Sequence, residues 1–165
     1  MSKKKKILLG LLIVLLILQF FRPSKTNLPV VAGHTIGAAF SVSPSVKSTL
    51  ETSCYDCHSN HTSFPWYTEI QPVGWWLQDH VNEGRRELNF DEFATYSPRR
   101  QFHKLEEIGE QVEEGEMPLS SYTIIHGNAK LSGAQKKELK DWSAAMQDSM
   151  KLHYPADSLK MKPRK

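Results

Sequence analysis

Both cysteines of this 165-residue chain lie in one pentapeptide, Cys54-Tyr55-Asp56-Cys57-His58. This C-x-x-C-H pattern is typical of covalent haem attachment. Two thiols separated by two residues can reach the two vinyl groups on one side of a porphyrin, while the adjacent imidazole turns back to bind the iron. The motif constrains the fold, because the chain must form a shell that excludes water from that group. We predict one haem c, bound covalently through Cys54 and Cys57, with His58 as the proximal iron ligand.

Three other interpretations of the motif stay open. A thioredoxin-like redox pair normally follows a strand in a βαβ unit, and the sequence shows no such strand. A zinc site made of Cys54, Cys57, His58 and His61 would lack the usual separation between ligand pairs. A structural disulfide across two residues would restrain little of the chain. Haem attachment is favoured over these three because the chain has only two cysteines and uses both here.

The second axial ligand is expected to come from Met117 or from one of the remaining histidines. Met117 lies 59 residues after His58, in a loop where Gly115 and Pro118 can hold an unusual backbone path. A thioether ligand would raise the haem potential relative to two histidines. The alternative, that Met117 fills a gap in the core, is disfavoured by its acidic neighbours. The weaker candidates for this ligand are His80, His103 and His126.

Aromatic and basic residues follow the motif and could contact the haem. Trp75 and Trp76 are expected to pack on the porphyrin or to donate an indole N–H to a propionate. Arg85 is expected to pair with a propionate. The competing interpretations are ordinary core packing for the tryptophans and a solvated surface charge for the arginine.

The N-terminus carries four lysines at residues 3–6, followed by an apolar run at residues 7–21. As a helix this run would span roughly 22 Å, less than the roughly 30 Å of a bilayer core, which would suit a cleaved signal peptide. No small-x-small cleavage site follows, and flanking lysines can snorkel to extend a short span. We therefore predict an uncleaved, single-pass anchor at residues 1–22 in the cytoplasmic (inner) membrane, with the remainder of the chain facing the periplasm.

The rest of the chain divides into three parts. Residues 23–43 are rich in proline and glycine and are expected to form a tether. Residues 44–150 are expected to form the haem-binding domain, and residues 151–165 a basic tail. Helices should begin after Ser43-Pro44, Pro72, Ser97-Pro98 and Ser132. Because no segment alternates like a strand, we predict an all-α fold, a small helical domain around one haem.

Charge argues against nucleic acid as a partner. The formal charge of +3 comes from the N-terminus, because residues 1–25 hold six lysines and arginines and no acid. Residues 26–165 hold 15 Lys and Arg against 18 Asp and Glu, a net charge of −3. A mildly acidic body lacks the basic face that nucleic acids require.

Several blocks of the sequence resemble the haem-binding domain family of bacterial exported proteins, which is similar in plan to small class I cytochromes c. The blocks are Cys54-Tyr-Asp-Cys57-His58-Ser-Asn, Phe64-Pro-Trp-Tyr67, Pro72-Val-Gly-Trp-Trp76, Asp79-His-Val-Asn-Glu-Gly-Arg85, Leu88-Asn-Phe90 and Gly115-Glu-Met-Pro-Leu119. The resemblance covers about residues 44–148. It implies a helical fold around a single covalent haem, with Met117 where the cytochrome pattern has its distal ligand. His61 falls where relatives would have another residue.

These features together predict an electron carrier outside the cytoplasmic membrane rather than an enzyme. Its partner would be a redox protein, either independent or part of a larger oxidoreductase to which the chain is docked. The alternative is a haem-based gas or peroxide sensor, or a peroxidase-like enzyme, in which the distal site is open or Met117 is easily displaced.

Overall fold

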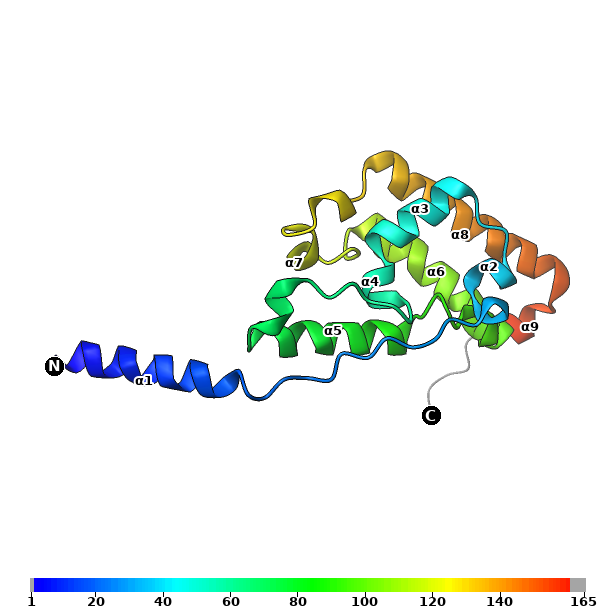
Figure 1. Cartoon of the computed structure of the whole chain (residues 1–165). Coiled ribbons are helices and arrows are strands. Elements are labelled where there is room, and N and C mark those ends of the chain that lie inside the picture. Colours follow the sequence, from blue (N-terminus) through cyan, green and yellow to red (C-terminus); the bar gives the residue numbers. More distant parts are fainter. Residues whose placement is uncertain (1, 161–165) are drawn as a thin grey trace.

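The computed structural model describes residues 2–160, and every regular element in that range is a helix. This confirms the prediction of an all-α fold. The elements in chain order are α1 (Lys3–Leu18), η1 (Ala32–His34), α2 (Ile36–Ala39), α3 (Pro44–Ser53), α4 (Tyr55–His58), η2 (Trp66–Glu69), α5 (Val73–Glu87), η3 (Phe93–Thr95), α6 (Pro98–Glu114), α7 (Ser120–Thr123), η4 (Gly127–Ala129), α8 (Gly133–His153) and α9 (Ala156–Leu159). Figure 1 shows α1 extending away from a body formed by the other helices.

Helices α6 and α8 form the main scaffold and make the most extensive helix contact in the molecule (Figure 1). The apolar positions of α6 recur at three and four residues, so they share one face. Leu105 and Val112 on that face are buried against Leu139 and Trp142 of α8. The two axes approach closely at Gly109, where an added Cβ would lie 3.0 Å from Ser143 Oγ.

The helix boundaries follow local signals in the sequence. The Ser97 side chain accepts a hydrogen bond from the Arg100 backbone N–H, and Pro98 takes the first helical position of α6. Gly115 ends α6 with a φ of 80°, a left-handed conformation that favours glycine. Ser132 and Gln135 form the predicted capping box at the start of α8.

Residues 23–43 do more than tether the domain. Ile36 on α2 is only 2 % exposed, and its backbone N–H donates to the Phe90 carbonyl at 2.7 Å. The ring of Phe40 contacts that of Phe93 edge-on. The packed body therefore begins well before residue 44, because Ile36 belongs to its core and Phe40 packs against that core.

The predicted basic tail at residues 151–165 is also packed where the structure describes it. Helix α8 continues to His153, and α9 returns the chain to α6. Leu159 is buried in the core at 4 % exposure. Residues 161–165 lie outside the described part of the chain.

Helix α1 is apolar after its four lysines, and no residue along it is buried. Among residues 2–160, no helix combines the length and the apolar character that crossing a membrane requires. The single-pass anchor at residues 1–22 stays a prediction.

Candidate haem site

The C-x-x-C-H motif forms a single helical turn. Helix α3 ends at Ser53, and Cys54 begins the next turn, α4. The backbone N–H groups of Cys57 and His58 both donate to the Cys54 carbonyl, at 3.2 and 2.9 Å. Because residues three and four apart are neighbours on a helix, this turn brings both thiols and the imidazole together.

The His58 imidazole is held by two backbone carbonyls. Its Nδ1 lies 3.0 Å from the Gly84 oxygen and 2.9 Å from the Leu88 oxygen. Carbonyl oxygens only accept hydrogen bonds, so Nδ1 must carry the proton and donate it. Nε2 is then the unprotonated nitrogen that can bind a metal, and the carbonyls fix the orientation of the ring.

Burial favours the same form of His58. Desolvation lowers the pKa of the imidazole, and it outweighs the opposite effect of the hydrogen bonds to Leu88 and Gly84. The neutral ring, which is the form that binds iron, is therefore favoured in the folded chain.

Gly84 lets α5 approach the motif. A Cβ on this residue would lie 2.7 Å from the Cys57 carbonyl oxygen and 3.2 Å from the Cys57 Cβ, closer than packed atoms allow. The absence of a side chain therefore places the α5 backbone directly against α4. This contact is what presents the Gly84 carbonyl to His58.

An apolar cavity of about 400 Å³ opens beside the motif. Cys54 and His58 line it from one side, and Met117 lines it from the loop after α6. Its apolar walls are formed by Leu50, Leu88, Phe90, Ile108, Val112 and Leu139. A second hollow of about 350 Å³ shares Cys54, His58 and Met117 with the first and adds Cys57.

The residues around this cavity fit a haem. The volume lies in the range of about 300–1,000 Å³ that is usual for ligand sites. Its walls combine a hydrophobic surface with two thiols, an imidazole whose Nε2 is free and one thioether. These are the groups that covalent attachment and axial ligation of iron use.

Met117 is positioned by the end of α6. The left-handed Gly115 turns the chain out of the helix, and the Met117 backbone N–H donates to the Gln111 carbonyl at 3.1 Å. The structure thus brings Met117 and His58 to the same cavity, although they are 59 residues apart. That Met117 binds the iron stays a prediction.

The two thiols do not resemble those of a redox pair. Burial raises the pKa of Cys54 to about 12 and that of Cys57 to about 11, and both cysteines are free. Catalytic dithiols need a lowered thiol pKa instead. A zinc site is also disfavoured, because no group of three or more His, Cys, Asp or Glu within residues 2–160 is arranged to hold a metal ion.

Three residues expected to contact the haem lie elsewhere. Trp75 donates its indole N–H to the Phe21 carbonyl. The ring of Trp76 lies 4.3 Å from that of His80, centroid to centroid, in a neighbouring hollow that Cys57 also lines. Arg85 donates to the backbone carbonyls of Ser59 and Thr26. None of the three lines the cavity that contains His58.

The structure adds a basic residue that sequence analysis missed. Lys104 on α6 lines the cavity, and its ammonium lies 2.5 Å from a Glu107 carboxylate oxygen and 3.7 Å from Glu87. A lysine at the edge of an apolar cavity can pair with a haem propionate. The sequence signal that could have identified Lys104 is its helical spacing, four residues before Ile108 and seven before Gln111, which line the same cavity.

A helical domain in which a C-x-x-C-H turn and a methionine share one apolar cavity is that of a haem protein. Residues 13–145, well over half of the chain, match the model of a haem-binding domain family. The chain therefore belongs to this family of haem-binding domains. Comparison with curated proteins and with solved structures gave no match.

Proposed function

We propose that this protein is a c-type cytochrome that carries single electrons outside the cytoplasmic membrane. The observation that supports this most strongly is the shared cavity, in which Cys54 and His58 face the same space as Met117. Haem supplies a reversible one-electron couple when it is bound. The chain supplies the ligands, excludes water and sets the potential.

Each residue of the site has a distinct role in this proposal. The thiols of Cys54 and Cys57 would hold the haem through two thioether bonds, each made by adding an S–H across a vinyl group, so no oxidant would be needed. His58 would bind the iron through Nε2, while Nδ1 donates to the carbonyls of Gly84 and Leu88. Met117 offers a soft sulfur ligand, which favours the reduced state.

The location and the partner belong to the same proposal. The lysines at residues 3–6 and the apolar α1 support insertion of this helix into the cytoplasmic membrane, with the haem domain at its outer face. A redox protein, free or within a larger oxidoreductase, would exchange electrons with the site.

Covalent attachment is tested by mass. We would express the full chain together with a cytochrome c maturation system and measure the denatured protein. One haem should be retained per chain in the original sequence, and Cys54→Ser/Cys57→Ser should release it. A colourless protein with the mass of the bare polypeptide would contradict the proposal.

The distal ligand and the function are tested together by Met117→Ala. The unsubstituted ferric protein should be low-spin with the weak far-red band of Met-to-iron ligation, and Met117→Ala should lose that band. Met146→Ala is a matched control, because Met146 packs against the core and away from the cavity. A high-spin spectrum of the unsubstituted protein that shifts with carbon monoxide or peroxide would favour a sensor or a peroxidase-like enzyme instead.

A further inference from the structure

Large apolar side chains gather on the surface between η2, the start of α5 and the end of α7. We call this surface the aromatic patch; it consists of Trp66, Val73, Trp76, Ile124 and Ile125. Three of these residues, Val73, Trp76 and Ile125, line one hollow together with Tyr67. Trp66 joins them through its ring contact with Tyr67.

The patch is highly exposed. Trp66 is 76 % exposed, Ile124 82 % and Ile125 61 %. None of the five residues lines the cavity that contains His58 and Met117. Contiguous apolar patches of this kind usually mark a surface that contacts a partner or a membrane.

Helix α1 is fixed to the domain beside this patch. Gln19, the residue after α1, accepts from the Gln71 backbone N–H at 2.9 Å and donates to the Gln71 carbonyl at 3.1 Å. Trp75 donates its indole N–H to the Phe21 carbonyl, and Arg22 pairs with Glu69 at 2.7 Å. No flexible linker therefore separates α1 from η2 and the first turn of α5.

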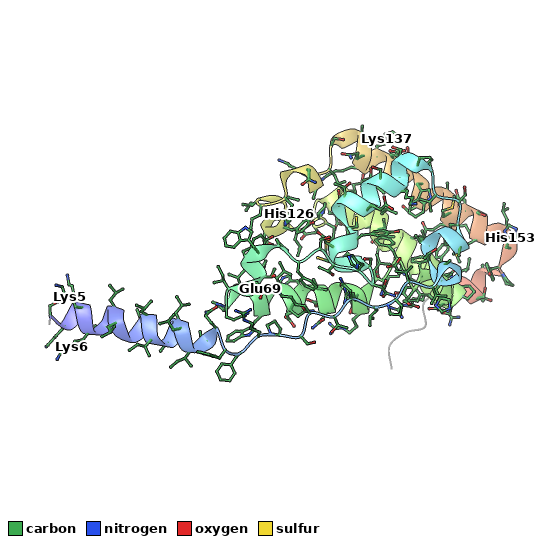
Figure 2. All side chains as sticks on the ribbon, viewed as in Figure 1. Lys5, Lys6, Glu69, His126, Lys137 and His153 are labelled. Atoms are coloured by element: carbon green, nitrogen blue, oxygen red, sulfur yellow. The ribbon has the colours of Figure 1, made fainter. Side chains whose placement is uncertain are left out.

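The figures show the same arrangement. In Figure 1, α1 leaves the body at the end where α5 begins and on the side where α7 lies. In Figure 2, Glu69 and His126 lie at that end, while Lys137 and His153 lie away from it. Glu69, which shares η2 with Trp66, and His126, which follows Ile125, thus lie at the end of the body from which α1 projects.

We propose that the aromatic patch rests in the headgroup region of the membrane that holds α1. This inference rests on the proposed insertion of α1. A helix of 16 residues extends about 24 Å, less than the roughly 30 Å of the hydrocarbon core, so an inserted α1 draws the attached face of the domain down to the bilayer surface. Tryptophan is the side chain enriched at that depth, because its ring is apolar and its N–H is polar.

Continuity with α1 favours lipid over a protein partner as the occupant of the patch. Apolar residues are exposed on α1, at Phe20 and Phe21 and on the patch, and the charges between them, Arg22, Lys25 and Glu69, pair with one another. Docking would also orient the haem site. Cys57, His80 and Tyr122 line both the hollow of the patch and the second haem hollow, so this edge of the site would face the bilayer.

The test uses the full-length holoprotein in vesicles of phosphatidylethanolamine and phosphatidylglycerol. Ile124→Cys provides a site for a nitroxide label on the patch, since Cys54 and Cys57 are consumed by haem attachment. Leu152→Cys is the matched control, because Leu152 is an equally exposed apolar residue (85 %) next to His153, at the opposite end of the body (Figure 2). Both substituted residues are exposed, so neither change removes core packing.

Label accessibility decides the result. The label at residue 124 should become more accessible to oxygen and lose accessibility to a water-soluble nickel chelate, whereas the label at residue 152 should keep its exposure to the chelate. Equal protection at both positions would mean non-specific adsorption and would overturn the proposal. So would protection at residue 124 without lipid that depends on protein concentration, which would indicate a second copy of the chain.

Failure of this inference can be told from failure of the proposed function. If the protein floats with the vesicles and keeps its haem while residue 124 stays open to the chelate, docking is wrong and the cytochrome stands. If the protein does not float, insertion of α1 and docking both fail. If the unsubstituted protein takes up the nitroxide label, Cys54 or Cys57 is free and haem attachment fails. Positions 124 and 152 are then labelled in the Cys54→Ser/Cys57→Ser chain, and the accessibilities of those labels decide docking.

Discussion

At the scale of single residues, the site depends on what surrounds His58 as much as on the motif itself. The motif supplies the imidazole, but the carbonyls of Gly84 and Leu88 determine which nitrogen is free. Such partners around a metal ligand usually matter for affinity almost as much as the ligand does. Gly84 contributes twice, through its carbonyl and through its missing side chain.

Gly84→Ala should destabilise the protein and disturb the site. Alanine normally strengthens a helix interior by up to about 1 kcal/mol relative to glycine. Here its Cβ would meet the Cys57 carbonyl at 2.7 Å, so α5 must move away from α4. We expect a loss of about 1–3 kcal/mol in the free energy of unfolding, the usual cost of overpacking. Urea denaturation measures it, and a weaker haem spectrum should accompany it.

Gly133→Ala is the control for that substitution. Gly133 begins α8, and nothing lies within 4 Å of the Cβ it would gain. Its stability should be unchanged or slightly higher. Equal effects of the two substitutions would contradict the role assigned to the contact between α4 and α5.

The cysteines predict a pH dependence that only the haem-free chain should show. Folding raises the thiol pKa from 9.0 to about 12 for Cys54 and to about 11 for Cys57, through burial. The folded state therefore holds these protons where the unfolded state releases them, so their stabilisation is complete below pH 9 and declines as the pH rises above it. One pKa unit corresponds to about 1.4 kcal/mol, so the two thiols should together cost roughly 1–3 kcal/mol by about pH 10.

Urea unfolding of the haem-free chain at about pH 8 and about pH 10 measures this loss. Cys54→Ser/Cys57→Ser, also without haem, should lose less stability over the same interval. Tyr55, whose pKa burial also raises to about 12, is common to both chains and cancels in the comparison. If the two chains decline equally, the thiols are not buried as the structure shows.

At the scale of elements, local signals were sufficient for the long helices. Ser43-Pro44, Ser97-Pro98 and Ser132 each begin a helix as predicted, because side-chain caps and an N-terminal proline act within one turn. Gly115 ends α6 for the equally local reason that glycine accepts a positive φ. The C-x-x-C-H motif and the glycine- and proline-containing loop around Met117 predicted that the cysteines, His58 and Met117 belong to one site, and together they line two adjoining hollows.

What the sequence did not reveal depends on contacts between distant residues. Residues 23–43 have the proline and glycine content of a linker, yet Arg85 and Asn60 bind their backbone from 31 to 59 positions away. Lys104 lines the haem cavity only because α6 forms one wall of the space that His58 also lines. The expectation that Arg85 pairs with a propionate failed for a similar reason. The sequence could not show that the Arg85 guanidinium already donates to the backbone carbonyls of Ser59 and Thr26.

Arg85→Ala should release the extended segment from the body. The guanidinium donates to the carbonyls of Ser59 (2.8 Å) and Thr26 (2.6 Å) and to the Thr62 hydroxyl (2.9 Å). Loss of these donors leaves the buried Ser59 carbonyl unpaired, at a cost of about 1–3 kcal/mol. The amide of Leu28, which donates to the Asn60 carbonyl, should then exchange its hydrogen faster.

Arg86→Ala is the matched control, because it removes the same charge from the next residue of α5. Arg86 is exposed and forms long ion pairs with Glu83 (3.7 Å) and Glu87 (3.5 Å). Surface pairs of this kind contribute about 0–1 kcal/mol. In Arg86→Ala the Leu28 amide should exchange its hydrogen at the same rate as in the unsubstituted protein. Similar acceleration in both variants would contradict the conclusion that Arg85 holds the extended segment against the body.

At the scale of the whole molecule, the first forty residues join an exposed helix to the packed core. Helix α1 exposes apolar residues along its length, whereas α2, less than twenty residues later, contributes Ile36 to the core. The segment between them runs along α5 and is bound by it (Figure 1). Hydrogen bonds and an ion pair therefore hold the end of the N-terminal helix against the body. The position of α1 thus constrains the orientation of the body that contains the candidate haem site.

The extent of the folding unit gives a last prediction. A chain that begins at residue 44, where the sequence places the start of the domain, would lack Ile36 and Phe40, which pack against the core. A chain that begins at residue 24 would keep both and lose only α1 and the residues that follow it. Removal of a large buried apolar side chain typically costs about 2–5 kcal/mol, so the shorter chain should unfold at a clearly lower urea concentration.

A second variant keeps this prediction testable if the shorter chain does not fold. Ile36→Ala in the full chain removes the same core contact without shortening the backbone, and it should cost about 2–5 kcal/mol. Val31→Ala serves as its control, because Val31 is 48 % exposed in the same segment and is not part of the core. Equal unfolding midpoints for Ile36→Ala and Val31→Ala would mean that the haem domain is complete without residues 24–43.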